Sequence, residues 1–275
     1  ALVVAAVGII LSAVALAAQW SRVQTDGSYT TLSNMVAVDG FSIFIGGVVL
    51  FATACSVLLA SRYLDRERLD GPEYLALMLL SASGMLAMSS SNDLIAIFVA
   101  LEIVSIPLYV LVAYDRRRST SLEAGMKYFL LGAFASAVFL YGIALTYGAT
   151  GSTGLVGIAN YLSEVTLLER GTLLAGLVLM LVGLGFKVAA APFHMWTPDV
   201  YQGAPTPVTA FMASATKAAA FAALIRILYT GLGGSSSDWR PLLWVLAVLS
   251  LLVGSIGAVI QTDVKRMLAY SSINH

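Results

Sequence analysis

Charged residues, cysteine and histidine are all scarce in this sequence of 275 residues. Only 11% of the residues are charged, whereas 59% are hydrophobic. Soluble domains carry about 25% charged residues, so a soluble globular protein of this length is excluded. Intrinsic disorder is excluded as well, because it requires low hydrophobicity and high net charge. The 15 basic and 15 acidic residues balance, so a polyanionic partner such as a nucleic acid is not indicated.

The single cysteine and the two histidines restrict the chemistry further. Cys55 lies in an apolar run, and one cysteine cannot form a disulfide or a Cys-ligated zinc or iron–sulfur site within the chain. His194 and His275 are too few for haem or a His-rich metal site. The sequence also lacks a Walker A motif and a GxGxxG motif after a strand. We therefore expect no metal, bound cofactor or redox chemistry in this chain itself.

Apolar runs of about 20 residues, long enough to cross a bilayer as a helix, recur along the sequence. They predict an all-α polytopic membrane protein. The predicted spans are 1–20, 38–60, 73–91, 93–114, 122–148, 171–196, 206–230 and 241–262, and a ninth begins near 264. Residues 1–20 lack the basic leader and cleavage site of a signal peptide, so we interpret them as a membrane helix. Because the sequence begins inside one apolar run and stops inside another, we expect a fragment of a longer protein.

Basic residues are concentrated in the linkers after the second, fourth and eighth spans, which must share one side of the membrane. The positive-inside rule places that side in the cytoplasm. These basic residues are Arg62, Arg66, Arg68, Arg116, Arg117, Arg118, Lys265 and Arg266, against Arg22, Arg170 and Arg240 on the other side. The linker 197–205 should also be cytoplasmic, although it contains no Lys or Arg.

Three ionisable residues, Glu102, Lys187 and Lys217, lie near the middle of predicted spans, and Lys127 lies one or two turns inside the fifth. A charge at mid-span costs roughly 2.5–3.5 kcal/mol on insertion scales, so such residues indicate a functional site. The alternative is a static ion pair or a side chain that reaches the interface, and for Lys127 this alternative is equally favoured. We expect Glu102 and Lys187 to face each other, directly or through one water molecule. Carboxylates and lysines that adjust each other's protonation can relay protons.

Proline supplies a second signal. Pro192 follows Lys187 closely and prevents the carbonyl of residue 188 from accepting a helical hydrogen bond, so we predict that this helix is interrupted between about 188 and 205. Broken helices at membrane depth mark ion or substrate sites in transporters. Pro107 is expected to disturb the helix of Glu102 in a similar way. His194, beside the break, is a candidate member of the relay, although a structural histidine is the more common case.

Two glycine–aspartate pairs share one spacing. Gly84 precedes Asp93 by nine residues, and Gly254 precedes Asp263 by nine. The charge rule places these two aspartates on opposite sides of the membrane. This is the pattern of an inverted repeat.

Four stretches together resemble the antiporter-like membrane subunits of respiratory complex I. They are LEIVSIPLYVLVAY (101–114), SLEAGMKYFLLGAFASAVFLYGIAL (121–145), GFKVAAAPFHMWTPDVYQGAPTPVTAFMASATKAA (185–219) and DVKRMLAYSSINH (263–275). Within that family, the MKYFLLGAFASA stretch and the residues around Lys217 are most similar to the subunit N branch, also called subunit 2.

This resemblance implies an antiporter-like fold with about fourteen helices, two inverted five-helix repeats and a broken helix in each. It implies that residues 1–72 correspond to helices 2–3 of the family, 73–230 to helices 4–8 of the first repeat, and 231–275 to helices 9–10 at the start of the second. It implies a proton relay through Glu102, Lys187 and Lys217, with Lys127 and His194 as less certain members.

The resemblance further implies a role as a proton-translocating subunit of an NADH:quinone oxidoreductase in the bacterial plasma membrane. NADH, FMN, iron–sulfur clusters and quinone would be bound by partner subunits, and M-like and K-like subunits would be the neighbours. A cation/proton antiporter subunit of the Mrp type is the alternative function. A third interpretation is a scaffold that keeps the charges without conducting protons.

Overall fold

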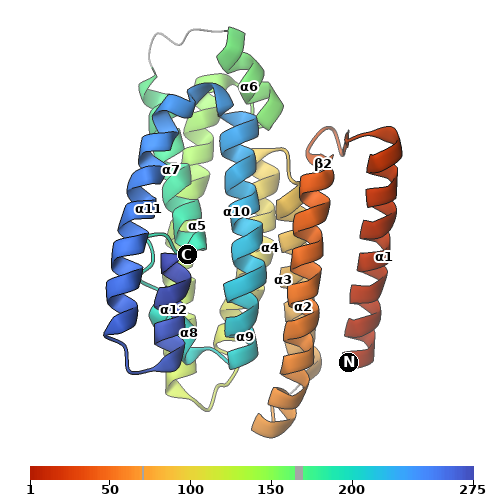
Figure 1. Ribbon diagram of the computed structural model, residues 1–275, viewed down its shortest axis with the longest axis vertical. Coiled ribbons are helices and arrows are strands. Elements are labelled where there is room, and N and C mark those ends of the chain that lie inside the picture. Colours follow the sequence, from red (N-terminus) through yellow and green to blue (C-terminus); the bar gives the residue numbers. More distant parts are fainter. Residues whose placement is uncertain (70, 165–169) are drawn as a thin grey trace.

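The computed structural model describes residues 1–69, 71–164 and 170–275 of the chain. Long helices run nearly parallel to one another and form a single bundle (Figure 1). In chain order the elements are α1 (Leu2–Asp26), β1 (Tyr29–Thr31), β2 (Val36–Val38), α2 (Gly40–Glu67), α3 (Gly71–Ser90), α4 (Leu94–Val112), α5 (Ser119–Thr150), α6 (Leu155–Glu164), α7 (Gly171–Val188), α8 (Thr197–Gly203), α9 (Thr206–Phe211), η1 (Met212–Thr216), α10 (Lys217–Ile225), η2 (Arg226–Gly231), η3 (Gly233–Ser235), α11 (Ser236–Val259) and α12 (Val264–Asn274).

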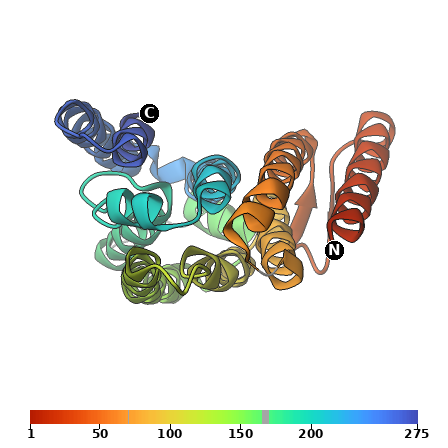
Figure 2. The same cartoon turned by 90° about the horizontal axis from the view of Figure 1, so that it is seen from below.

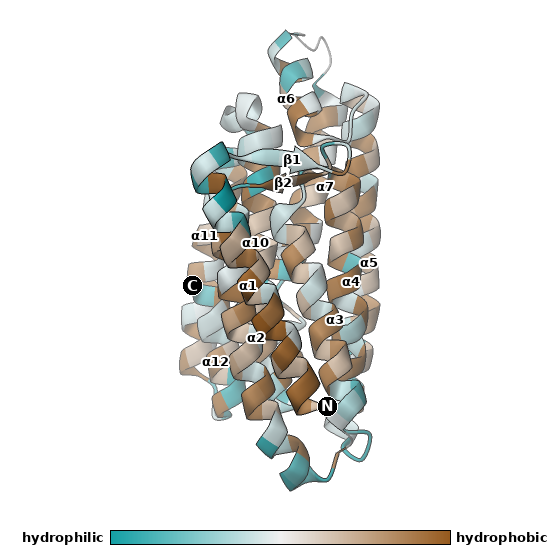
Figure 3. Ribbon diagram, turned by 90° about the vertical axis from the view of Figure 1, so that its right-hand side faces the viewer, coloured by the Kyte–Doolittle hydropathy of each residue, from teal (hydrophilic) through white to brown (hydrophobic). Residues whose placement is uncertain are grey.

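The predicted membrane spans are confirmed. Within the described residues, eight helices are long and apolar enough to cross a membrane, and α12 begins at Val264, where the ninth was expected. Large apolar side chains such as Phe51, Phe134 and Val259 are more than two-thirds exposed on the outside of the bundle. Apolar residues cover the middle of the helices and hydrophilic residues gather at their ends (Figure 3). This distribution is that of a protein whose solvent is lipid around the middle and water at both ends.

The helix of Lys187 is interrupted as predicted. α7 ends at Val188, Ala189 takes a left-handed conformation with φ 62°, and the chain becomes helical again only at Thr197. The expected single helix over 171–196 is therefore eight residues shorter than predicted. Pro107 does not interrupt its helix, because α4 continues through this residue to Val112. Neighbouring helices allow a transmembrane helix to tolerate a proline in this way.

The basic linkers lie at one end of the bundle, as expected. The Arg117 guanidinium donates to the Glu67 carbonyl (2.6 Å), which joins the linkers after α2 and α4. Lys265 donates to the Gln202 carbonyl (3.1 Å), which joins the start of α12 to the linker that lacks basic residues of its own. α12 therefore supplies the positive charge that the segment 197–205 lacks. That this end faces the cytoplasm stays a prediction.

The three short elements β1, β2 and α6 were not predicted from the sequence. The β1–β2 hairpin and the amphipathic helix α6 cover the end of the bundle opposite the basic linkers (Figure 1). Their apolar segments are too short to give a periodic signal. Two π-helical segments, η1 and η2, lie in the helix of Lys217. A π segment inserts one extra residue per turn and is frequent at functional sites.

The helical hairpins α3–α4 and α11–α12 are built alike. Asp93 caps the start of α4 and Asp263 caps the start of α12. A Cβ on Gly84 would lie 2.8 Å from the backbone nitrogen of Val104, and a Cβ on Gly254 would lie 2.6 Å from that of Asn274. In both hairpins, the residue whose backbone the glycine approaches follows the capping aspartate by the same number of positions. α4 and α12 start at opposite ends of the bundle (Figure 1), so the predicted inverted relation of the two hairpins is confirmed.

Figure 2 shows α11 and α12 at one edge of the bundle and α1 at the opposite edge. Between these edges, α5 packs on α7, and α2 and α3 pack on the helix formed by α9, η1 and α10. Fully buried Phe139 and Met180 mark the α5–α7 contact, and fully buried Met78 and Met85 line α3. The lysine-bearing helices α7 and α10 are therefore held in the middle of the molecule.

Gly84→Ala tests the hairpin contact, and Gly148→Ala is its control. Because the new methyl group would meet the α4 backbone, we expect Gly84→Ala to lower the free energy of unfolding by about 1–3 kcal/mol. A Cβ on Gly148 meets nothing within 4 Å, so that variant should be neutral or slightly more stable. Thermal unfolding of the full-length protein in detergent measures both. Equal melting temperatures for the two variants would contradict the proposed close approach.

Candidate functional site

The helix break beside Lys187 has its backbone groups satisfied by side chains from elsewhere. The indole of Trp196 donates to the Phe186 carbonyl oxygen (3.0 Å). The Ala191 N–H donates to the Ser250 hydroxyl on α11 (2.9 Å). In a bilayer each unsatisfied backbone group costs several kcal/mol. These two side chains therefore allow α7 to end inside the membrane, one residue after the lysine.

The Lys187 ammonium is buried and has neutral hydrogen-bond partners. Lys187 is only 4% exposed. It donates to the Ser105 hydroxyl on α4 (2.7 Å) and to the Tyr128 hydroxyl on α5 (3.2 Å). The Ser105 hydroxyl in turn donates to the Leu101 carbonyl. A buried cation needs acceptors, and here hydroxyl groups from two neighbouring helices supply them.

Aromatic rings fix the position of Tyr128. Its ring stacks on Trp196 (centroids 4.8 Å apart, planes at 23°) and meets Tyr109 edge-on (4.9 Å, 75°). The Lys187 ammonium lies 5.4 Å from the centre of the same ring. The break, through Trp196, thus orients the hydroxyl that accepts from the lysine. Neither Ser105 nor Tyr128 was selected from the sequence, because neutral residues within a span give no charge signal.

Glu102 lies one turn before Ser105 on α4, and its carboxylate interacts electrostatically with Lys187 and Tyr128. Its Oε1 atom is buried without a hydrogen-bond partner in the described part of the chain. The direct Glu102–Lys187 ion pair that was expected is not among the ion pairs of the described residues, since Ser105 meets the ammonium instead. Contact through one water molecule stays a prediction.

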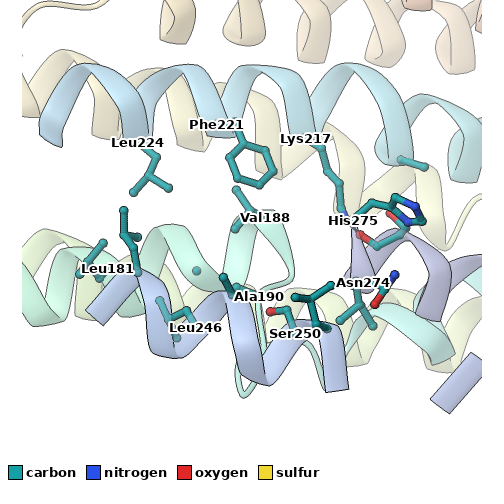
Figure 4. Close-up of a pocket in the computed structure, with 17 residues that line it drawn as sticks. Leu181, Val188, Ala190, Lys217, Phe221, Leu224, Leu246, Ser250, Asn274 and His275 are labelled. Carbon is teal, nitrogen blue, oxygen red and sulfur yellow. Dashed lines mark hydrogen bonds between the residues drawn. The ribbon is translucent and has the colours of Figure 1, made fainter. Parts of the chain in front are cut away.

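Lys217 lies where η1 passes into α10, and its ammonium donates to the Ser272 carbonyl on α12. It borders a cavity of about 550 Å³ between α7, α10, α11 and α12. The polar residues Lys217, Ser250, Asn274 and His275 gather at one end of this cavity, whereas Leu181 and Leu224 line the other end (Figure 4). The cavity also reaches Val188 and Ala190, at the helix break. The Lys187 segment and Lys217 therefore border one common space.

Lys127 belongs to a different, more exposed cluster at the end of the bundle with the basic linkers. Its ammonium pairs with Glu123 (2.6 Å) and with Asp199 (2.8 Å), and its side chain is 42% exposed. Asp199 also pairs with Arg266 of α12 (2.5 Å). Burial raises the pKa of Asp199, but the hydrogen bonds and charges of Lys127 and Arg266 outweigh burial and hold this pKa below its usual value. Lys127 thus forms ion pairs, as one of its two interpretations expected, and its part in a relay stays a prediction.

The two histidines lie in different places. His194 is half-buried in the loop between α7 and α8, and its carbonyl accepts from the Thr197 N–H (2.9 Å). The described hydrogen bonds of Lys187 do not include it. His275 follows α12 and borders the cavity of Lys217. A role for His194 in the relay stays a prediction.

A partly buried ion pair between Arg226 and Asp39 was missed, in which the Arg226 side chain is 6% exposed and that of Asp39 26%. The Arg226 guanidinium contacts both carboxylate oxygens of Asp39 (2.8 and 2.9 Å) and donates to the Ser89 carbonyl (2.8 Å). The Asp39 carboxylate also accepts from the Ser42 N–H (2.7 Å) and so caps the start of α2. An arginine inside the predicted span 206–230 was a visible signal. The pair ties the helix of Lys217 to α2 and α3.

The discontinuous helix with its buried lysine, followed by a second lysine-bearing helix, defines an antiporter-like polytopic membrane protein. Residues 91–275 match the family described as "NADH:quinone oxidoreductase/Mrp antiporter, TM". The chain belongs to this family.

Two relatives are named NADH-quinone oxidoreductase subunit N, and the resemblance to this branch is confirmed. The chain is 48% identical over 246 residues to the protein of Trichlorobacter lovleyi, which covers 90% of this chain and 50% of the relative. It is 54% identical over 217 residues to the protein of Mycobacterium tuberculosis (strain ATCC 25618 / H37Rv), which covers 78% of this chain and 40% of the relative. The chain thus spans about half the length of the curated relatives it matches.

Solved structures confirm the antiporter-like fold. A chain of respiratory complex I from Thermus thermophilus has a TM-score of 0.79 and 42% identity, over 97% of this chain and 55% of that one. A chain of the Mrp complex from Dietzia sp. DQ12-45-1b has the same TM-score of 0.79 with 26% identity, over 98% of this chain and 51% of that one. The fold is therefore shared by both branches, whereas sequence identity is higher to the complex I chain.

The ion pair between Arg226 and Asp39 gives a prediction that Arg226→Leu and Asp39→Asn test together. Removing one partner leaves the other without its charged hydrogen bonds, which costs about 1.5–3 kcal/mol. We expect each single variant to lower the melting temperature of the full-length protein. The double variant should lose less than the sum of the two losses, and exposed Arg240→Leu should lose little. Additive losses in the double variant would show that the two side chains do not depend on each other.

Proposed function

We propose that this chain is part of a proton-translocating membrane subunit of NADH:quinone oxidoreductase. Protons would be relayed through Glu102, Lys187, Lys217 and internal water, driven by redox reactions in other subunits. The observation that carries this proposal is Lys187, which is buried at a helix break and bound by neutral hydroxyl groups. A lysine can release its proton, whereas an arginine in a protein cannot.

The surroundings of Lys187 support a relay more than a static ion pair. A static buried pair is stable when its charges make direct, well-oriented hydrogen bonds, as Arg226 and Asp39 do. Lys187 instead bonds hydroxyl groups, which can both accept and donate a proton. A cavity of about 10 Å³ borders Lys187, Ser105 and Tyr109, the size of about one water molecule. These features supply the acceptors that a mobile proton needs.

The cavity beside Lys217 supports the next step of the relay. It extends from the break at Val188 and Ala190 to Lys217 and its polar neighbours Ser250 and Asn274. With a volume of about 550 Å³ it has room for several water molecules, each of which occupies about 30 Å³ in the liquid. Water in this cavity would carry a proton from the break to Lys217, while Lys187 itself borders the separate cavity of about 10 Å³. His194 and Lys127 are less central members of the proposed path.

The proposed complex determines the cofactors and partners. NADH, FMN, iron–sulfur clusters and quinone would bind to other subunits, and M-like and K-like membrane subunits would be the direct neighbours. The complex would be located in the bacterial plasma membrane. Residues 73–230 would form the first antiporter-like repeat. The helices of residues 1–72 would precede it, and the start of the second repeat, residues 231–275, would follow it.

An Mrp-type cation/proton antiporter subunit is the second candidate, because the Mrp chain has the same TM-score as the complex I chain. Purification of the native complex distinguishes the two functions. Co-purified flavin, iron–sulfur clusters and NADH-dependent quinone reduction would support the first. A complex that exchanges cations for protons without these cofactors would support the second.

Lys217→Met tests the relay in the assembled complex. We expect proton pumping and the coupled quinone reduction to fall by about tenfold or more, with assembly intact, because the side chain has similar bulk and no proton to pass. Lys217→Arg should fail to restore pumping. Proton uptake into reconstituted vesicles measures both variants. Full pumping by Lys217→Met would remove this lysine from the path.

Ser105→Ala tests the hydroxyl that binds the Lys187 ammonium, with exposed Ser83→Ala on α3 as the control. A hydrogen bond to a charged group contributes about 1.5–3 kcal/mol, so we expect the pumping rate to fall by about tenfold. Ser83→Ala should pump at the normal rate, because its hydroxyl bonds the backbone of its own helix. Equal rates for both variants would exclude a role for Ser105 in the proton path.

A further inference from the structure

The hairpin formed by α11 and α12 contacts the discontinuous segment 189–204 at three places along its length. One contact lies at the break, one at the start of α8 and one at the end of α8. Together they extend over the whole segment that follows Lys187. The side chains on the hairpin are Ser250, Arg266 and Lys265.

The first contact satisfies the backbone at the break. The Ala191 N–H has lost its helical acceptor, and the buried Ser250 hydroxyl accepts it at 2.9 Å. Ala191 is itself buried, with 1% exposure. The position of the break thus depends on a side chain of α11.

The second contact is an ion pair at the first turn of α8. Asp199 uses one carboxylate oxygen for Arg266 of α12 (2.5 Å) and the other for Lys127 of α5 (2.8 Å). Arg266 also donates to the Gln202 side chain (3.1 Å), one turn further along α8. α8 is thus held between the first repeat and the start of the second.

The third contact is at the carboxyl end of α8. The Lys265 ammonium donates to the Ala204 carbonyl (2.6 Å) and the Gln202 carbonyl (3.1 Å). The last carbonyls of a helix lack intrahelical partners and carry partial negative charge. A lysine from α12 therefore caps the helix that follows the break.

We propose that the α11–α12 hairpin is a clamp that positions the discontinuous segment, and through it Trp196 and Tyr128, around Lys187. Ser250, Lys265 and Arg266 are positioning residues in this clamp. A displacement of α12 would move α8 and, through Trp196, the hydroxyl that accepts from Lys187. The relay in the first repeat would in this way respond to the position of the second. The expected effect of the clamp on pumping rests on the proposed function, whereas its expected effect on the segment 189–204 does not.

The experiment uses the full-length protein in its assembled complex and compares Arg266→Gln, Arg266→Lys and Ser250→Ala, with exposed Arg116→Gln as the control at the same end. Two quantities are measured: hydrogen–deuterium exchange of peptides that cover 189–204, and protons pumped per quinone reduced. We expect exchange in this segment to rise by about fivefold or more in Arg266→Gln and Ser250→Ala, the factor for one lost hydrogen bond. Exchange in α5 should stay unchanged.

The pumping ratio should fall in the same two variants, and Arg266→Lys should restore both quantities in large part, because it keeps a charged donor for Asp199. Arg116→Gln should match the unaltered complex. If Arg266→Gln fails to assemble, Ser250→Ala decides, since it removes a single hydrogen bond. Unchanged exchange over 189–204 in Ser250→Ala would overturn the clamp. Increased exchange with a normal pumping ratio would overturn its role in positioning, whereas a purified complex without NADH-dependent quinone reduction would instead overturn the proposed function.

Discussion

The need to satisfy backbone groups inside a bilayer is the constraint on which this structure depends. A helix that ends at Val188, beside Lys187, leaves carbonyl and N–H groups without intrahelical partners in an environment with little water. The structure meets this need with two side chains: Trp196, ten residues further along the chain, for the Phe186 carbonyl, and Ser250 on α11 for the Ala191 N–H. Proline starts the break locally, and the packing of α11 and α5 around it stabilises the helix end beside the buried lysine.

The same constraint explains why the cations within the spans have different partners. Arg226 cannot release its proton, and it has the partner that a permanent charge requires, the Asp39 carboxylate with two hydrogen bonds. Lys187 and Lys217 have hydroxyl and carbonyl acceptors instead, and each borders a cavity. Lys127, nearer the end of the bundle, forms ion pairs where water can also reach it. The chemistry of the partner thus distinguishes cations that hold the helices together from those that could carry protons.

Much of the fold could be predicted from the sequence, because hydrophobic length and proline act locally. The eight spans, the interruption after Lys187 and the inverted glycine–aspartate hairpins all follow from residues close together in the chain. The site was predicted less completely. Glu102, Lys187 and Lys217 stand out by charge, but Ser105 and Tyr128 are neutral and lie 82 and 59 residues from the lysine they bind. Asp199 was not selected from the sequence, and it is paired with Lys127 and Arg266. Such pairs depend on which helices meet, and a single sequence does not contain that information.

The inverted hairpins connect these observations. α3–α4 and α11–α12 repeat one construction, with a capping aspartate and a glycine contact at matching positions. In the first copy, α4 supplies Ser105, which binds the ammonium of the broken helix. In the second copy, the first turn of α12 contacts the segment beyond the break and supplies Lys265 and Arg266. One broken helix is therefore held by both copies of the hairpin, by α4 at the lysine and by α12 beyond the break. Because the copies run in opposite directions, the basic first turn of α12 meets α8 at the end of the bundle, while the middle of α4 meets Lys187 inside it. The opposite directions of the two hairpins thus place the neutral hydroxyl of Ser105 before the interruption and the ion pair of Arg266 with Asp199 after it.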